Sequence, residues 1–402
     1  MGDPAAVDHR TNDANAGAGM LDGVTVVDLA SVGPAARASR WLADYGADVV
    51  KVGPMPRDGG VQITPPAYAY SAHRGMRRML LDLKSDAGRD AFLRFCRSVD
   101  VVIESFRPGV VDRLGIGYEA LCAQNPGIVL CSTTGYGQTG PKANWAGHDL
   151  NYLAVSGYLH CSGTDARGGP ALPGATVADS AAGGLHAVAA VCAALVRRSR
   201  TGKGAHLDVS IADGALSLMS LAIDEYFATG TEPGPGHGLL TGRYAWYDVY
   251  QGGDGRWLAV AAIEGRFFDN LCRALGCERW IGHQYDDDVI GAMRNDFRNA
   301  FATRNRDVWV DELGPADACV SAVHDVPALV EDPQFGARHA FVDVEHPIEG
   351  EFRQVGAVLA GQGDAAAQPI ADMAATHTPQ ILAEAGFAPA DIDALTVSGH
   401  IA

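Results

Sequence analysis

Basic residues are scarce in this chain of 402 residues. Lys and Arg number 31 against 48 Asp and Glu, which gives a formal net charge of −17. Nucleic-acid recognition needs a basic face, and so does electrostatic binding to an anionic membrane surface. The composition therefore argues against nucleic-acid and membrane partners. An anionic ligand would require a local basic pocket in an otherwise acidic protein.

Paired cysteines and metal-binding motifs are also lacking. The eight cysteines are scattered through apolar runs without a C-x-x-C pair, and the thirteen histidines include no H-E-x-x-H motif. We therefore expect buried free thiols in a reducing compartment and no dedicated metal site.

Two glycine-rich stretches resemble nucleotide-binding motifs but lack the context those motifs require. Gly135–Gly140 matches G-x-G-x-x-G, yet Pro141 and a stretch without apolar periodicity follow it, where a dinucleotide site needs a helix. Thr201–Gly204 has no Ser or Thr after its lysine, so it is not a P-loop. No Gly-x-Ser-x-Gly motif occurs either. We predict no redox or nucleotide cofactor.

The first 20 residues lack the basic and apolar regions of a signal peptide and are typical of a flexible tail. We also expect no apolar run of the roughly 18 residues that a membrane span needs. Together with the unpaired cysteines, these features predict a cytoplasmic protein.

Apolar, β-branched runs alternate with helical patterns over the first half of the chain. Such alternation predicts βαβ units and a largely parallel sheet, hence an α/β fold. A long, nearly uncharged helix is expected at about 181–198, before Gly202. The expected strands are 23–29, 47–52, 79–83, 100–104, 128–132 and 206–210.

A Gly- and Pro-rich stretch at 229–238 indicates a domain linker, and a hairpin around Gly252–Gly255 follows it. We therefore divide the chain into a tail (1–20), a large α/β domain (21–225), a linker (226–238), a smaller α+β domain (239–335) and a segment that returns to the large domain (336–402).

Three segments carry candidate catalytic residues. His148 precedes a polar stretch, and an imidazole takes and returns protons near neutral pH. Asp179 directly precedes the long helix, and Gly183 and Gly184 lie near the helix start, where backbone N–H groups can hold an oxyanion. Glu264 ends an apolar strand. Each also has an ordinary interpretation: a surface imidazole, an N-cap or a solvated charge.

Together these segments resemble the family III CoA-transferases, and within them the α-methylacyl-CoA racemases. The similarity extends from about Leu21 to Gly361. It is carried, in this order, by the stretches Leu42–Val52, His73–Lys84, Glu104–Gly109 with Leu114–Tyr118, Gly135–Pro141, Gly147–Tyr152 and Ala262–Phe268.

The resemblance implies roles for the candidate residues. Gly-His-Asp-Leu-Asn-Tyr at 147–152 is similar to the racemase form of the motif, which implies that His148 and Asp179, 31 residues apart, are the acid/base pair. Glu264 is expected to complete the site. Asp149 is a candidate that either assists catalysis or only forms local hydrogen bonds.

The resemblance also implies that arginines bind the CoA phosphates, as bidentate phosphate contacts favour. Arg107 and Arg113 are the main candidates, and Arg74 and Arg78 are weaker ones. After Val52 the chain has Gly53-Pro-Met-Pro56 in place of an acid and a basic residue or proline, so this contact is expected to be lost or moved to Lys51 or Arg57. Thr241–Tyr247 also departs from the family pattern, near the expected acyl pocket.

The resemblance implies an enzyme that acts on an acyl-CoA substrate, without a further cofactor. The first hypothesis is inversion at Cα of a 2-methylacyl-CoA through an enolate. The second is CoA transfer through an anhydride on Asp179. A non-enzymatic acyl-CoA-binding protein and another isomerase or lyase remain alternatives. The fold implied is a large Rossmann-like domain plus a smaller domain, in a homodimer of two interlocked chains.

Overall fold

The computed structural model describes residues 19–30, 33–55, 74–346, 350–360 and 376–402. The predicted tail, except Gly19 and Met20, and Arg57 lie outside these residues. The chain divides into two compact units, which are described separately. Unit 1 comprises Met1–Asn144, Gly183–Val209 and His339–Ala402, and unit 2 comprises Trp145–Ala182 and Ser210–Arg338. Unit 2 thus takes in segments that the sequence analysis assigned to the large domain.

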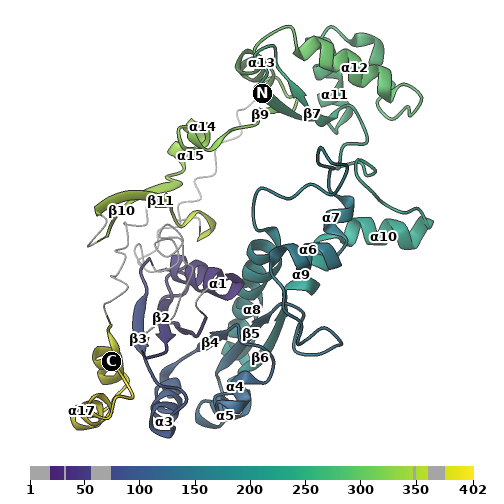
Figure 1. Ribbon diagram of the computed structural model, residues 1–402. Helices are drawn as coiled ribbons and strands as arrows, with labels where there is room; N and C mark the ends of the chain where they lie inside the picture. The colour runs from purple at the N-terminus through teal and green to yellow at the C-terminus, as the bar shows by residue number, and fades with distance from the viewer. Residues whose placement is uncertain (1–18, 31–32, 56–73, 347–349, 361–375) are drawn as a thin grey trace. The chain divides into compact units, whose positions relative to one another are not determined.

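Unit 1 is built on a six-stranded sheet with the order β3-β2-β1-β4-β5-β6 (Figure 1). The pairings β1–β2, β2–β3, β1–β4 and β4–β5 are parallel. Since the chain crosses from the β2 side of β1 to its β4 side, the strand order reverses beside β1. The strands are β1 (Thr25–Asp28), β2 (Asp48–Gly53), β3 (Arg77–Leu80), β4 (Val101–Glu104), β5 (Val129–Thr134) and β6 (Ala205–Ser210).

Helices cover both faces of this sheet because its central strands are apolar on both sides. Val26 packs in a cluster with α1 (Gly33–Asp44) and α8 (His186–Thr201), whereas Val27 packs in another cluster with α3 (Asp86–Phe95) and α5 (Tyr118–Gln124). Successive residues of β1 therefore serve opposite cores, as the period of two in a strand requires. The short helices η1 (Cys96–Ser98) and α4 (Val110–Arg113) complete this part of the chain.

The end of the chain belongs to unit 1. Helices α16 (Thr378–Glu384) and α17 (Pro389–Val397) place Ile381 and Ile392 in the α3-side core. The hairpin of β10 (Phe341–His346) and β11 (Gly350–Val355) and the turn η4 (Val358–Ala360) precede them.

Unit 2 contains an antiparallel sheet with the order β7-β8-β9, formed by Tyr247–Gln251, Trp257–Ala261 and Val320–Ala322. Its core includes Trp246, Phe268, Phe297 and Phe301. Its helices are α6 (Asp149–Val155), α7 (Tyr158–Cys161), α9 (Ile211–Leu218), α10 (Ser220–Thr229), α11 (Gly265–Ala274), η3 (Glu278–Trp280), α12 (Ile290–Phe301), α13 (Arg306–Leu313), α14 (Val326–Val330) and α15 (Pro333–Ala337).

The long helix differs from its prediction. A π-helical segment, η2 (Ala178–Leu185), comes first and α8 follows it directly. The combined helix Ala178–Thr201 is long and apolar enough to cross a membrane by length and composition, so the expectation that no such run exists is wrong. Ala187, Val188 and Val191 of this helix pack in the core of unit 1.

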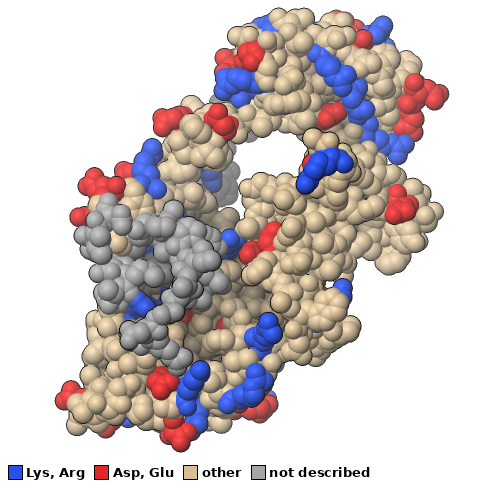
Figure 2. All heavy atoms as spheres, in the orientation of Figure 1, with Lys and Arg blue, Asp and Glu red and all other residues tan. Residues whose placement is uncertain are grey.

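The predicted α/β class with a parallel sheet is confirmed. The eight cysteines are free thiols, and burial raises the pKa of Cys131 to about 12. On the face drawn in Figure 2, Lys and Arg side chains lie in separate groups among Asp, Glu and uncharged residues.

Candidate active site

His148 lies at the start of α6, as its N-cap residue, with an exposed side chain. Its backbone N–H donates to Oδ1 of Asn151 at 3.0 Å. The hydroxyl of Tyr152 donates to the carbonyl of Gly147 at 2.6 Å. These two bonds tie the loop before α6 to the first turn of the helix, so the imidazole extends from a fixed backbone position.

Asp149 joins the two predicted catalytic segments. Its Oδ1 accepts a hydrogen bond from the backbone N–H of Asp179 at 2.9 Å, across 30 residues of sequence. The start of α6 and the first turn of η2 are therefore in direct contact. The structure thus brings together the segments that carry His148 and Asp179, because the N–H of Asp179 bonds to Asp149, the residue after His148.

Asp179 lies inside a π-helix, and this segment differs from its sequence interpretation. Since η2 begins at Ala178, Asp179 is in its first turn, and the N-cap interpretation is wrong. The N–H groups of Asp179 and Ser180 already donate, to Asp149 and to the carbonyl of Thr176. π-Helical turns occur frequently at functional sites.

Gly183 and Gly184 are not at the helix N-terminus, which corrects the placement that was expected for them. They are buried at the sixth and seventh positions of η2. Helix α9 also contacts this segment: a Cβ on Gly214 would lie 2.1 Å from the carbonyl oxygen of Ala182. The two helices therefore meet backbone against backbone. The role of the two glycines at an oxyanion stays a prediction.

Glu264 lies at the N-cap position of α11, exposed, on a different element from the two that Asp149 connects. Burial raises the pKa of the Cys319 thiol, and the charge of Glu264 adds to this shift. The backbone before Glu264 is held by Gln284, whose Nε2 donates to the carbonyl of Ile263 at 2.7 Å. The part that Glu264 plays beside His148 stays a prediction.

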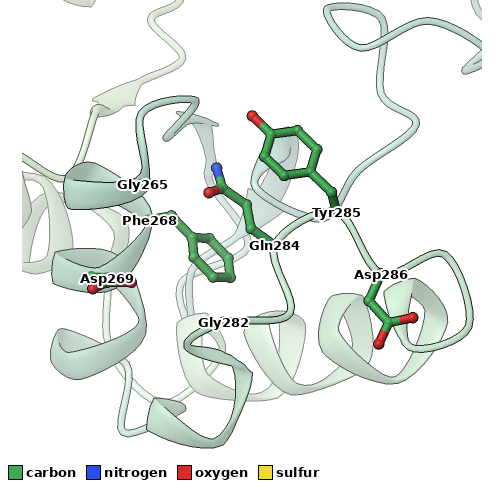
Figure 3. A pocket seen from close by; sticks show the side chains of 7 residues that line it. All are labelled: Gly265, Phe268, Asp269, Gly282, Gln284, Tyr285 and Asp286. Atoms are coloured by element: carbon green, nitrogen blue, oxygen red, sulfur yellow. The ribbon is translucent and has the colours of Figure 1, made fainter.

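An open hollow of about 560 Å³ lies beside this turn. In Figure 3 the rings of Phe268 and Tyr285 flank the amide of Gln284, while Asp269 and Asp286 point away from it. The backbone of Gly265, next to Glu264, forms part of the wall. The lining of the hollow thus combines two aromatic rings and one amide with two acidic residues, Asp269 and Asp286.

Arg107 and Arg113 lie after β4, next to the point where the strand order reverses. In open α/β sheets, ligands bind outside the carboxyl ends of the strands at such a point. Both side chains are exposed, and Nη1 of Arg113 lies 3.3 Å from where a Cβ on Gly109 would be. The two arginines therefore flank the turn at Gly109, and both remain candidates for phosphate contacts.

The structure argues against Lys51 and Arg74 as phosphate ligands. Nζ of Lys51 pairs with buried Asp28 at 2.6 Å. Nη2 of Arg74 pairs with Asp44 at 2.6 Å, and both side chains are largely buried. Their charges are already matched by carboxylates. Arg78 lies on β3, and its backbone N–H donates to Nδ1 of His377.

Sequence reasoning missed a polar network that joins Glu104, at the end of β4, to side chains of β5 and β6. Glu104 hydrogen-bonds to Ser132, and Ser132 Oγ lies 3.0 Å from Nε2 of His206. Gln138 lies in the Gly135–Pro141 loop. Its backbone N–H donates to the two carboxylate oxygens of Asp208, at 3.1 and 3.0 Å. A glutamate that ends an all-apolar strand was the available signal. Among the described residues, no His, Cys, Asp and Glu cluster could hold a metal ion.

Comparisons with known proteins agree on one family. The model of "CoA-transferase family III" matches residues 21–372. Alpha-methylacyl-CoA racemase of Homo sapiens is 33% identical over 329 residues, covering 81% of this chain and 83% of that protein. Acetyl-CoA:oxalate CoA-transferase of Acetobacter aceti is 31% identical over 339 residues, covering 81% and 86%.

A solved structure gives the same family. The crystal structure of a CAIB/BAIF family protein from Brucella suis has a TM-score of 0.68 and 29% identity, and the match covers 81% of this chain and 90% of that one.

Proposed function

Since the chain belongs to CoA-transferase family III, we propose that it is a racemase that inverts the α-carbon of a 2-methylacyl-CoA thioester. The observation that carries this proposal is the hydrogen bond from the Asp179 N–H to the carboxylate of Asp149, the residue after His148. It holds an imidazole and a carboxylate on adjoining segments, which two-base proton transfer requires.

The chemistry follows from these two groups. One base removes the α-proton, the C–H electron pair moves into an enolate, and the conjugate acid of the other base returns a proton to the opposite face. In one direction the Asp179 carboxylate accepts the proton and protonated His148 donates; in the other, neutral His148 accepts and protonated Asp179 donates. The proton count balances in both directions, and Glu264 orients or charge-balances His148.

The enolate oxygen needs hydrogen-bond donors, because charge develops on it in the transition state. The thioester acidifies the α-proton, and the donors lower the barrier further. Arg107 and Arg113, exposed at the carboxyl end of the sheet, are proposed to bind the CoA phosphates. The substrate thus supplies the CoA, and no separate cofactor is proposed.

We propose further that two copies assemble as interlocked chains. Large apolar side chains on α9 and α10 support a partner chain here: Leu218, Leu221 and Phe227 are 51%, 69% and 78% exposed. A cytoplasmic location is proposed as well, because the eight cysteines are free thiols.

CoA transfer is the second candidate, favoured by the similarity to the Acetobacter transferase. In this reaction the Asp179 carboxylate attacks the thioester carbonyl, CoA thiolate leaves, and an acyl anhydride forms on Asp179. The CoA thiolate attacks the aspartyl carbonyl of the anhydride, and the first acid leaves as its carboxylate. A second carboxylate attacks the resulting aspartyl thioester and releases CoA thiolate, which then attacks the acyl carbonyl of this second anhydride and frees the Asp179 carboxylate.

One experiment separates the two reactions. The protein is incubated with a single enantiomer of a 2-methylacyl-CoA in D₂O, and deuterium at Cα is followed by NMR and mass spectrometry. Racemisation with deuterium incorporation, abolished in His148→Ala and in Asp179→Asn, supports the racemase. Hydroxylamine-trapped acyl Asp179 without exchange at Cα refutes it and supports transfer.

A further inference from the structure

Glu104 is a buried carboxylate that the proposed reaction does not use. It ends β4 and is 2% exposed. Its Oε2 accepts a hydrogen bond from the backbone N–H of Phe106 at 2.6 Å. Ser132, 1% exposed on the neighbouring strand β5, hydrogen-bonds to the same carboxylate. Burial of a carboxylate is costly unless it is hydrogen-bonded, and here at least two donors meet it.

The donors form an ordered chain. If the single hydroxyl proton of Ser132 is donated to Glu104, the Oγ of Ser132 accepts from Nε2 of His206 at 3.0 Å. The ring of His206 in turn stacks on Tyr118, with centroids 5.7 Å apart and an interplanar angle of 19°. Tyr118 is the first residue of α5.

This series of contacts begins and ends on either side of the segment that carries Arg107 and Arg113. Glu104 fixes the beginning of residues 105–117, and Tyr118 fixes the end. Phe106 packs against the α3-side core, so the side chain next to Arg107 is anchored. Gly109 has φ 75°, a left-handed conformation that turns the chain into α4 and brings Arg113 back over it.

We propose that Glu104 is a positioning residue that holds the segment 105–117, so that Arg107 and Arg113 present their guanidinium groups to the phosphates of CoA. This inference rests on the proposed function, in which these arginines bind CoA. Glu104 touches no reacting atom. It acts through the Phe106 N–H and, by way of Ser132 and His206, through Tyr118.

The test measures CoA affinity by calorimetry and acyl-CoA kinetics for the full chain. Glu104→Ala leaves the Phe106 N–H unpaired, so the Kd for CoA and the KM rise about tenfold. The kcat stays within about twofold, because uniform binding alone is lost. Glu104→Gln is the matched control: its amide oxygen still accepts from Phe106, so affinity stays within about threefold of wild type.

Two further arms separate positioning from general damage. Adding Glu104→Ala to the Arg107→Ala/Arg113→Ala double variant leaves CoA binding within about twofold of that double variant, because Glu104 acts through the two arginines. An acyl-pantetheine substrate without phosphates is turned over equally by wild type and Glu104→Ala. If Glu104→Ala fails to fold, His206→Ala, at an exposed position, raises the Kd for CoA about threefold with unchanged kcat, by loss of the link to Tyr118.

The outcomes are distinct. Wild-type CoA affinity in folded Glu104→Ala, a loss of kcat at unchanged KM, or an equal loss with acyl-pantetheine overturns the positioning role. If Arg107→Ala weakens CoA binding and Glu104→Ala does not, only the positioning role fails. Absence of CoA binding by the wild-type protein refutes the proposed function itself.

Discussion

Lys51 offers a direct test of whether a candidate phosphate ligand is a structural residue. Its ammonium group lies 2.6 Å from Oδ2 of Asp28, which is 0% exposed, and 3.1 Å from the carbonyl oxygen of Ala30. The other carboxylate oxygen of Asp28 accepts the Ala30 N–H at 2.7 Å. Lys51→Met keeps the length of the side chain but leaves a buried carboxylate without its cation.

The expected cost is large. Removing one partner of a buried ion pair costs about 3–5 kcal/mol, because the remaining charge is uncompensated. With a slope of about 3 kcal/mol per molar urea, the midpoint of unfolding falls by about 1 M or more. The double variant Asp28→Asn/Lys51→Met removes both charges, and its amide oxygen still accepts from Ala30. It therefore recovers much of the loss.

The assay is urea unfolding at pH 7, followed by circular dichroism, with CoA affinity measured on the folded protein. We expect lower stability in Lys51→Met and a Kd for CoA within about twofold of wild type. An unchanged midpoint with a tenfold weaker Kd would refute this reasoning and make Lys51 a phosphate ligand, as the sequence suggested.

Three other substitutions test contacts at the site and in the core. Asp149→Ala removes the acceptor for the Asp179 N–H. It is expected to lower the free energy of unfolding by about 1 kcal/mol and to slow α-proton exchange in D₂O. Asp149→Asn, which keeps an acceptor oxygen, retains the stability. Gly214→Ala forces a Cβ against the Ala182 carbonyl and lowers the free energy of unfolding by about 1–3 kcal/mol. Gly291→Ala in α12 is the control: open space surrounds this position, so the protein is equally stable or more stable. Equal effects of the two substitutions in urea unfolding would contradict the close helix contact. Burial raises the pKa of Glu104, so the native state holds its proton more tightly than the unfolded state, and stability is lost as pH rises from the ordinary carboxyl pKa through the raised one. Glu104→Gln removes that loss, so the variant gains stability relative to wild type with rising pH; a constant difference across the pH series of unfolding would contradict it.

The parallel sheet was predictable from sequence because its central strands are short, largely apolar runs. Thr25–Asp28 and Val101–Glu104 fall within the predicted ranges 23–29 and 100–104. Ser85 caps α3 by accepting from the Gly88 N–H, an interaction between residues three positions apart. Such features depend on residues a few positions apart, and local pattern suffices for them.

The π-helix was not predictable in this way. Ala178–Leu185 contains small residues without helical periodicity, and its contacts are distant: Asp149 bonds to its first turn, and Gly214 of α9 meets the Ala182 carbonyl. Long-range packing therefore accompanies a conformation for which the local sequence has no signature. The same limit applies to Arg74, whose guanidinium donates to the Val355 carbonyl, 281 residues away.

The two candidate reactions place different demands on the same segment, and this makes His148 the discriminating residue. Both need the Asp179 carboxylate, as a base or as a nucleophile, so any variant of Asp179 stops both. Only inversion needs a second proton-transfer group on the other face of the α-carbon. The Asp149 bond fixes Asp179 beside the residue next to His148 and is compatible with both chemistries. Loss of His148 therefore abolishes inversion at Cα if the protein is a racemase, whereas CoA transfer through Asp179 survives it.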